Sequence, residues 1–487
     1  MITKELNNNI SETEKRSFRE VKYQFLAACC DLANIVVMGQ GCAIGWLSPT
    51  LPILQSDDSP LESGKLTIEE ASWVGSISSI GSIVGTIYFG LVSIYVGCKN
   101  TLVLCALPVT TFWIFVIFAS NAWHLCAGRF IQGLTAGAFL CVQLYLADIA
   151  DERIRGILGT LLTLSVNIGI LIGYIGGTFL DYRTVPYVMM TFPILFIFLF
   201  LLMPNTPQYY IKSHRFTEAE KSLRFYRNCK SKYSKTDEEI QKELCLMSAI
   251  AKQNEVAGRP KLSDFFNLPT MKVMLIGPTL MAVSQFSGSY VLTNFAVTIF
   301  QRSGSNYSPH TSSIVFGCLQ IAGTYVTTLF IDRFGRKVLL IISGSGCAVG
   351  LTLMGIFSYL FECGVDVSAL NWIPVVSLSF VIFIASIGLI PIPYVIIAEV
   401  LPQKIRIIGT TICTTTVSIW AAIILNRFPY ILLHLELYGC MWLFASVSIF
   451  GLVFTVFFVP ETRGKKLDVL IDDIECNKNN QKIATIC

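Results

Sequence analysis

Acidic and basic residues recur in this sequence at a fixed spacing of seven, each time at the end of a long apolar run. Asp148 precedes Arg155 by this interval, and Glu399 precedes Arg406 by the same interval. Carboxylates and guanidinium groups placed at helix ends can form ion pairs, which are strong where adjacent lipid keeps the dielectric constant low. The pattern therefore predicts reversible ion pairing at the ends of membrane helices.

Residues that would carry catalysis or metal binding are scattered along the chain. The four histidines lie at positions 124, 214, 310 and 434, and no cysteine pair has the spacing of a zinc site. Most of the 16 cysteines lie within apolar runs, where cysteine acts as a small packing residue. The sequence also contains no nucleotide-binding loop. We therefore expect no enzyme activity, no metal and no cofactor.

The composition indicates a protein that crosses a membrane many times. Of its 487 residues, 53% are hydrophobic and 14% are charged, and the mean hydropathy is +0.62. A soluble chain carries about 25% charged residues, so a soluble enzyme, a disulfide-rich secreted scaffold and a disordered protein are excluded. The net charge of +4 is too small to indicate binding to nucleic acid.

Twelve apolar runs, each long enough for a membrane helix, divide into two sets of six. The first set lies at 24–47, 71–94, 101–120, 125–149, 156–180 and 187–204. The second set lies at 272–300, 311–332, 338–360, 372–400, 407–427 and 439–459. We predict an all-α membrane protein with two six-helix bundles, 23–204 and 272–459. A helical central segment at 205–271 joins them, and tails at 1–22 and 460–487 flank them.

Basic residues mark one set of helix ends. Both tails, the central segment and alternate short connections are basic, whereas the first of the other connections carries Asp57, Asp58 and Glu62. Lys and Arg in short connections favour the cytosolic side of a membrane. We therefore predict that both termini and the central segment are cytosolic, and we expect a multi-pass protein of the plasma membrane.

The two halves also echo each other. The pair Asp148 and Arg155 follows the fourth run, as Glu399 and Arg406 follow the tenth. Gly97-Cys98-Lys99 after the second run corresponds to Gly335-Arg336-Lys337 after the eighth. A duplicated helical unit is typical of transporters, which bind substrate between their two repeats.

Several longer motifs resemble those of the sugar porter family of the major facilitator superfamily, over about residues 23–466. The best matches are GRFIQG at 128–133, IDRFGRK at 331–337, AEVLPQKIR at 398–406 and VPETRGK at 459–465. Two further signatures are matched in part, by PNTPQYY at 204–210 and SQFSGS at 284–289. Residues 155–171 are most similar to the insect branch that includes trehalose carriers.

The resemblance implies a gate of ion pairs that holds the cytosolic side closed while the outside is open. Its residues here are Arg129, Asp148, Arg155, Asp332, Arg333, Arg336, Glu399 and Arg406. The basic members alone would also be explained by anchoring of the topology, but the acidic members would not. The amino-terminal half departs from the family, because the stretch 94–99 has a single charge, on Lys99. This loss predicts either a weaker state open to the outside or a relaxed or specialised carrier.

The resemblance also implies a sugar site, which requires amide and hydroxyl side chains together with an aromatic face. The family's sugar-binding positions align with Gln285, Gln320, Tyr394, Thr163, Ser284 and Tyr290, and Asn167 and Asn294 lie one turn further along their helices. Each of these side chains could instead hydrogen-bond to a neighbouring helix.

We predict a carrier that moves a hexose or a trehalose-like disaccharide by facilitated diffusion. A proton-coupled symporter remains an alternative, although Cys42 and Ala43 stand where a proton-binding carboxylate would pair with Arg129. Asp31 is predicted to lie too far from Arg129 to take that role. A sugar sensor that does not transport is the second alternative. The expected partners are a small-molecule sugar and the lipid bilayer, without nucleic acid, and a monomer is compatible with the sequence.

Overall fold

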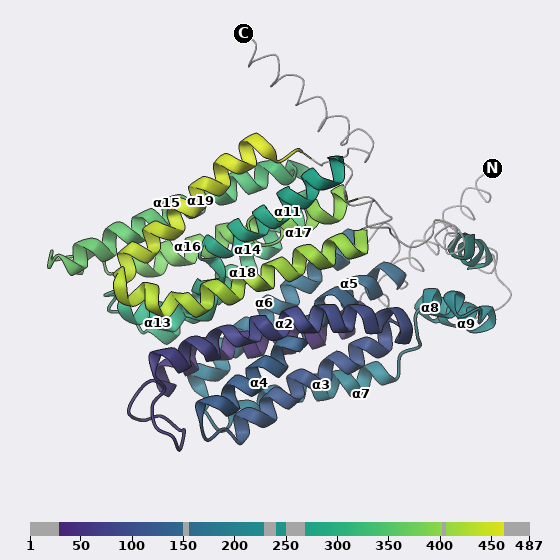
Figure 1. The fold of residues 1–487 in the computed structure, drawn as a ribbon, viewed down its shortest axis with the longest axis horizontal. Coiled ribbons are helices and arrows are strands. Elements are labelled where there is room, and N and C mark those ends of the chain that lie inside the picture. The colour runs from purple at the N-terminus through teal and green to yellow at the C-terminus, as the bar shows by residue number, and fades with distance from the viewer. Residues whose placement is uncertain (1–28, 150–154, 228–239, 250–267, 402–405, 462–487) are drawn as a thin grey trace, which may run out of the picture.

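Two helical bundles lie side by side in the computed structural model, which describes residues 29–149, 155–227, 240–249, 268–401 and 406–461 (Figure 1). The amino-terminal bundle comprises the helix Cys29–Leu54, α2 (Ile68–Val96), α3 (Cys98–Ile117), α4 (Ala122–Leu134), α5 (Gly137–Ile149), α6 (Arg155–Phe179) and α7 (Val185–Leu201). The carboxyl-terminal bundle comprises α11 (Leu268–Phe286), α12 (Ser289–Asn294), α13 (Ala296–Arg302), α14 (Pro309–Phe334), α15 (Arg336–Glu362), α16 (Ile373–Ile387), α17 (Ile392–Val400), α18 (Arg406–His434) and α19 (Glu436–Phe458).

The described helices account for the predicted membrane spans. Ten are long and apolar enough to cross a bilayer by length and composition, and two shorter apolar helices, Val185–Leu201 and Met274–Phe286, complete the set. A membrane interior offers no water to backbone N–H and C=O groups, so each span must satisfy them within its own helix. The prediction of an all-α membrane protein with twelve spans in two bundles is confirmed.

Three spans are interrupted where the sequence reads as continuously apolar. The fourth span divides between α4 and α5, and the seventh divides after Phe286 and again at Phe295. Gly288 supplies the first break of the seventh span, with a φ of 88° that favours glycine. The tenth span divides between α16 and α17, next to Pro391 and Pro393. The predicted end of the eleventh span at 427 was wrong, because α18 continues to His434 through the apolar residues that follow Arg427.

The two ends of the molecule differ in what they carry. The central segment contributes α8 (Pro207–Lys212), α9 (Phe216–Tyr226) and helical residues 240–249, all at one end of the bundles (Figure 1). We call this end, which also carries Lys99 and Arg336, the basic end. The loop 55–67 lies at the opposite end, which we call the acidic-loop end.

Glycines allow neighbouring helices of the amino-terminal bundle to touch backbone to backbone. A Cβ atom added to Gly133 would lie 2.0 Å from the carbonyl oxygen of Ser78, and one added to Gly169 would lie 2.1 Å from that of Met38. Both positions therefore admit only glycine. Glycines thus allow close packing of α4 against α2 and of α6 against the first helix.

We expect Gly133→Ala to destabilise the bundle by roughly 1–3 kcal/mol, because the new methyl group would force α2 and α4 apart. Gly344→Ala is the matched control, since a Cβ there would make ordinary contact at 3.6 Å, and alanine favours a helix. The measurement is the unfolding temperature of each purified variant in detergent. Equal unfolding temperatures for Gly133→Ala and the parent would contradict this packing.

Candidate functional site

Among the described helices, the contacts between the bundles include two extensive pairs, α2 with α18 and α6 with α14. Asn167 on α6 and Gln320 on α14 are both buried in the second pair. The Gln320 Nε2 donates to Asn167 Oδ1 at 3.2 Å, and the Asn167 Nδ2 donates to Thr324 Oγ1 at 2.7 Å. Two of the predicted site residues are therefore bonded to each other across the interface between the bundles.

Several buried polar atoms have no hydrogen-bond partner among the described residues. They include Gln285 Oε1, Gln320 Oε1 and Trp420 Nε1. Gln285 and Trp420 lie on the neighbouring helices α11 and α18, and Gln320 lies on α14, which packs against α6 of the other bundle. The indole ring of Trp420 packs edge-on against Phe286, with ring centroids 5.6 Å apart. Two amide oxygens, an indole N–H and an aromatic face are groups that can pair with a ligand rich in hydroxyl groups.

The remaining predicted sugar-binding residues differ in their burial and in their contacts. The Tyr394 ring packs against Phe139 of the other bundle, with ring centroids 6.0 Å apart. The Asn294 Nδ2 donates to the Tyr290 carbonyl oxygen on its own helix at 2.9 Å. Thr163 is half-buried and Ser284 is buried, and neither side chain is bonded to another predicted site residue in the part of the chain that is described.

Arg129 is the most deeply buried cation of the candidate site, with 0% of its surface exposed. Its Nε donates to the Val74 carbonyl oxygen at 3.2 Å, and its Nη1 donates to the Ala43 carbonyl at 3.1 Å and to Gln132 Oε1 at 3.2 Å. No carboxylate among the described residues is bonded to it. The expectation that Arg129 faces the first helix near Ala43 is confirmed, and carbonyl oxygens take the place of an acidic partner.

At the acidic-loop end, hydrogen bonds join the two bundles directly. The Tyr174 hydroxyl donates to the Thr293 carbonyl oxygen at 2.6 Å, and the Val297 N–H donates to Ser48 Oγ at 3.0 Å. Asn426 joins α18 to α2, because its Nδ2 donates to Ser76 Oγ at 3.3 Å and its carbonyl oxygen accepts from the Ser72 hydroxyl. All of these residues lie in the parts of their spans nearest this end. The bundles are therefore closed together at the acidic-loop end.

The predicted gate at the basic end is described only in part. The side chains of Arg155, Asp332, Glu399 and Arg406 lie outside the described residues, so their pairing stays a prediction. The side chain of Arg333 is exposed. The backbone N–H groups of Arg336 and Lys337 donate to the Glu461 carboxylate at 3.0 and 3.2 Å.

Glu461 therefore lies at the first turn of α15, where a carboxylate offsets the positive end of the helix dipole. Sequence reasoning did not identify this contact, although Glu461 belongs to the VPETRGK motif. The contact joins the end of α19 to the start of α15 within the carboxyl-terminal bundle.

The amino-terminal bundle is held at its basic end by the central segment. The Thr206 hydroxyl donates to Asp148 Oδ2 at 3.0 Å, and Arg227 Nη1 donates to the Ile149 carbonyl oxygen at 2.8 Å. Arg227 also forms an ion pair with Glu243. These contacts fix the end of α5 beside the stretch 94–99, which lacks the charges of the family pattern.

Two buried tyrosines extend this connection. The hydroxyl groups of Tyr145 on α5 and Tyr226 on α9 lie 3.1 Å apart, and Tyr226 also donates to the Pro204 carbonyl oxygen at 2.7 Å. Neither ring is exposed. Phenol groups and a threonine thus act together with the Arg227–Glu243 ion pair in holding the basic end of this half. Nothing in the sequence distinguished Tyr145, Tyr226 or Arg227, because the partners are far apart along the chain.

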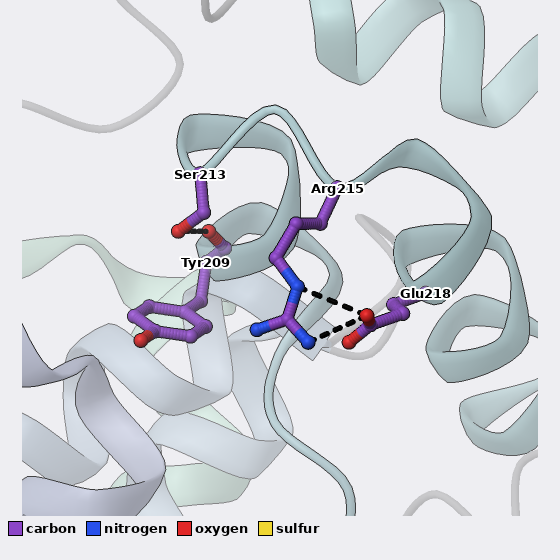
Figure 2. Close-up of polar contacts among 4 residues, drawn as sticks. All are labelled: Tyr209, Ser213, Arg215 and Glu218. Carbon is purple, nitrogen blue, oxygen red and sulfur yellow. Dashed lines mark hydrogen bonds and ion pairs between the residues drawn. The ribbon is translucent and has the colours of Figure 1, made fainter.

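Arg215 and Glu218 form another ion pair on the central segment, and this pair is more exposed than Arg227 and Glu243. The Arg215 Nε donates to Glu218 Oε1 at 2.9 Å, and 54% and 36% of the two side chains are exposed (Figure 2). The Arg215 guanidinium also lies over the Tyr210 ring, 5.3 Å from its centroid. Water screens such a pair, so it contributes little to stability.

The family model described as "Sugar (and other) transporter" matches residues 44–471. The chain is 34% identical over 451 residues to the facilitated trehalose transporter Tret1 of Polypedilum vanderplanki, covering 91% of this chain and 86% of that protein. It is 33% identical over 466 residues to Tret1 of Bombyx mori, covering 95% and 88%.

Solved structures with a similar fold include the inward open conformation of the xylose transporter XylE from E. coli. The TM-score is 0.74 at 19% identity, over 93% of this chain and 99% of that one. The proton:xylose symporter XylE bound to 6-bromo-6-deoxy-D-glucose gives a TM-score of 0.71 at 20% identity, over 92% and 98%. At this level of identity the likeness concerns the fold.

We expect Arg227→Gln to lower the free energy of unfolding by roughly 1–3 kcal/mol, because it removes a bond to the Ile149 carbonyl and leaves Glu243 without its cation. Arg215→Gln, in the exposed pair, should leave the unfolding temperature unchanged. Thermal unfolding of both purified variants in detergent measures the difference. If the two substitutions have equal effects, the central segment does not hold the end of α5.

Proposed function

The chain belongs to the sugar transporter family of the major facilitator superfamily, and we propose that it carries a hexose or a trehalose-like disaccharide across the plasma membrane by facilitated diffusion. The observation that supports this best is the pair of buried amides, Asn167 and Gln320, that meet at the interface between the bundles. Asn167 and Gln320 come from opposite bundles, and Gln285 and Gln320 each keep an unpaired amide oxygen. A sugar bound there would contact both bundles at once.

Sugar hydroxyl groups match this set chemically. Each hydroxyl group donates one hydrogen bond and accepts others, so it can pair with the Gln285 and Gln320 oxygens and with the Trp420 indole N–H. The Phe286 and Trp420 rings offer an apolar face to the carbon side of the sugar ring. Polar groups of a binding site that are left unmatched are costly, so these residues favour hydroxyl-rich ligands over apolar ones.

Alternating access requires that contacts between the bundles form and break. The bundles are joined at the acidic-loop end by single hydrogen bonds, such as that from Tyr174 to the Thr293 carbonyl. Each such bond contributes about 1 kcal/mol, so the set can be broken within a transport cycle. We propose that the basic end faces the cytosol, in line with its Lys and Arg residues, and that the described state is closed to the outside.

Passive transport fits the surroundings of Arg129. A proton-coupled cycle needs a group near the site that gains and loses a proton, but the bonded partners of Arg129 are the Val74 and Ala43 carbonyls and the Gln132 amide. Asp31 lies twelve residues before Ala43 on the same helix, about 18 Å at 1.5 Å per residue. This separation places Asp31 at the basic end, where its side chain is exposed.

We expect Gln285→Ala to raise the KM for sugar uptake several-fold, because one lost hydrogen bond to a sugar hydroxyl is worth about 1 kcal/mol. Asn294→Ala should have a smaller effect, since its amide nitrogen already bonds to its own helix. Thr416→Ala, whose hydroxyl bonds to the Ile412 carbonyl on an exposed face, serves as the control.

The measurement is uptake of a panel of labelled sugars in cells that lack their own sugar carriers. A larger effect of Asn294→Ala than of Gln285→Ala would show that the alignment through the seventh span is wrong. If the protein reaches the cell surface and binds sugar saturably but takes up no sugar, it acts as a sensor and not as a carrier.

We also expect uptake to be insensitive to a protonophore, and Asp31→Asn to retain most of it, because Asp31 is too distant to exchange a proton with the site. Initial rates in the same cells, with and without the protonophore, provide the test. Accumulation above the external concentration that collapses with the proton gradient, and that Asp31→Asn abolishes, would place the chain among proton symporters.

A further inference from the structure

A groove runs between the end of α7 and helix α9, apart from the interface between the two bundles. Its volume is about 440 Å³, and Leu202 and Met203 line one side. The other side is lined by Glu218, Lys221 and Phe225, which recur at intervals of three and four and so share one face of α9. The groove therefore has an apolar wall from a membrane helix and a mixed wall from the central segment.

The apolar wall continues the lipid-facing surface of α7. The exposed fractions of Phe198, Leu201 and Leu202 are 72%, 58% and 82%. Large apolar side chains that are exposed side by side at a span end contact acyl chains in a bilayer. Phe225, 39% exposed on α9, extends this apolar surface across the groove. The groove thus opens at the level where acyl chains meet headgroups.

The polar side of the groove carries one cation that has no partner. Lys221 is exposed and has no hydrogen bond or ion pair within the described part of the chain. Its neighbours differ, because Arg215 pairs with Glu218 and Arg224 pairs with Glu220. The Glu218 carboxylate in the groove pairs with Arg215, so Lys221 is the cation of the groove lining that is left to pair with an anionic ligand.

The position of α9 is fixed by the bundle. The Tyr226 hydroxyl donates to the Pro204 carbonyl oxygen at 2.7 Å, and the Ser222 hydroxyl donates to the Asn205 carbonyl. Ala219 and Leu223 are buried on the same side of the helix. The face with Lys221 and Phe225 is consequently held beside Leu202, so fixed contacts between α9 and the end of α7 form the groove.

We propose that this groove binds an anionic phospholipid of the leaflet at the basic end. The phosphate lies at Lys221, and an acyl chain follows Leu202 and Phe225. Anionic lipids are attracted to cationic side chains at the cytosolic surface, and an amphipathic helix with aromatic residues lies at the boundary between headgroups and chains. The site is separate from the sugar path, so the proposal stands independently of the transported sugar.

The test is a titration of the purified full-length protein in detergent with fluorescent phosphatidylserine or phosphatidylcholine. We expect the protein to prefer phosphatidylserine, and Lys221→Gln to weaken its binding about fivefold, as expected for one lysine charge at a membrane surface. Lys242→Gln, an exposed lysine of the same end that does not line the groove, should bind as the parent does. Unfolding temperatures without added lipid establish that both variants are folded.

Three results would overturn the proposal. The first is equal affinity of the parent for the two lipids, and the second is equal affinity of Lys221→Gln and the parent for phosphatidylserine. The third is competition by glycerophosphoserine, which lacks acyl chains, at the same concentration as the lipid. Sugar uptake by Lys221→Gln in phosphatidylcholine vesicles should match uptake by the parent. The uptake assay thus tests the carrier function, and the lipid titration tests the groove.

Discussion

Contacts between the two bundles must form in one conformational state and break in another. The packing of the whole molecule follows from this requirement. Lipid chains are as apolar as leucine, so helices in a bilayer gain little from hydrophobic contact with each other. Within the amino-terminal bundle, glycines such as Gly133 bring backbones into direct contact. Between bundles, single hydrogen bonds such as that from Gln320 to Asn167 predominate among the described polar contacts. Each bundle can therefore move as a unit.

The basic ends of the two bundles are stabilised by different chemistry. In the carboxyl-terminal bundle, the Glu461 carboxylate accepts bonds from the first backbone N–H groups of α15. In the amino-terminal bundle, Arg227 and Tyr226 of the central segment hold the end of α5. The central segment thus takes part in the architecture of the carrier, and the loss of charges at 94–99 does not leave this end without support.

The sequence predicted the architecture well, because membrane helices follow from runs of apolar residues alone. It could not predict the breaks after Thr135 and at Gly288, since hydropathy does not record where a helix is interrupted. Asn167 and Gln320 were each predicted as site residues, but their bond depends on which faces of α6 and α14 meet. Thr324, one turn beyond Gln320, was missed although its spacing places it on the same face. Tyr226 and Arg227 left no signal, because their partners lie far away in the sequence.

We propose that the chain carries sugar across the membrane through a site shared by both bundles. The most direct measurement is counterflow in proteoliposomes loaded with unlabelled trehalose or hexose and diluted into a trace of the labelled sugar, without any ion gradient. We expect labelled sugar to accumulate transiently inside and then to equilibrate, because a carrier exchanges substrate across the membrane in both directions. Absence of this transient for every sugar of the panel, from a protein that is folded and inserted, would contradict a carrier function.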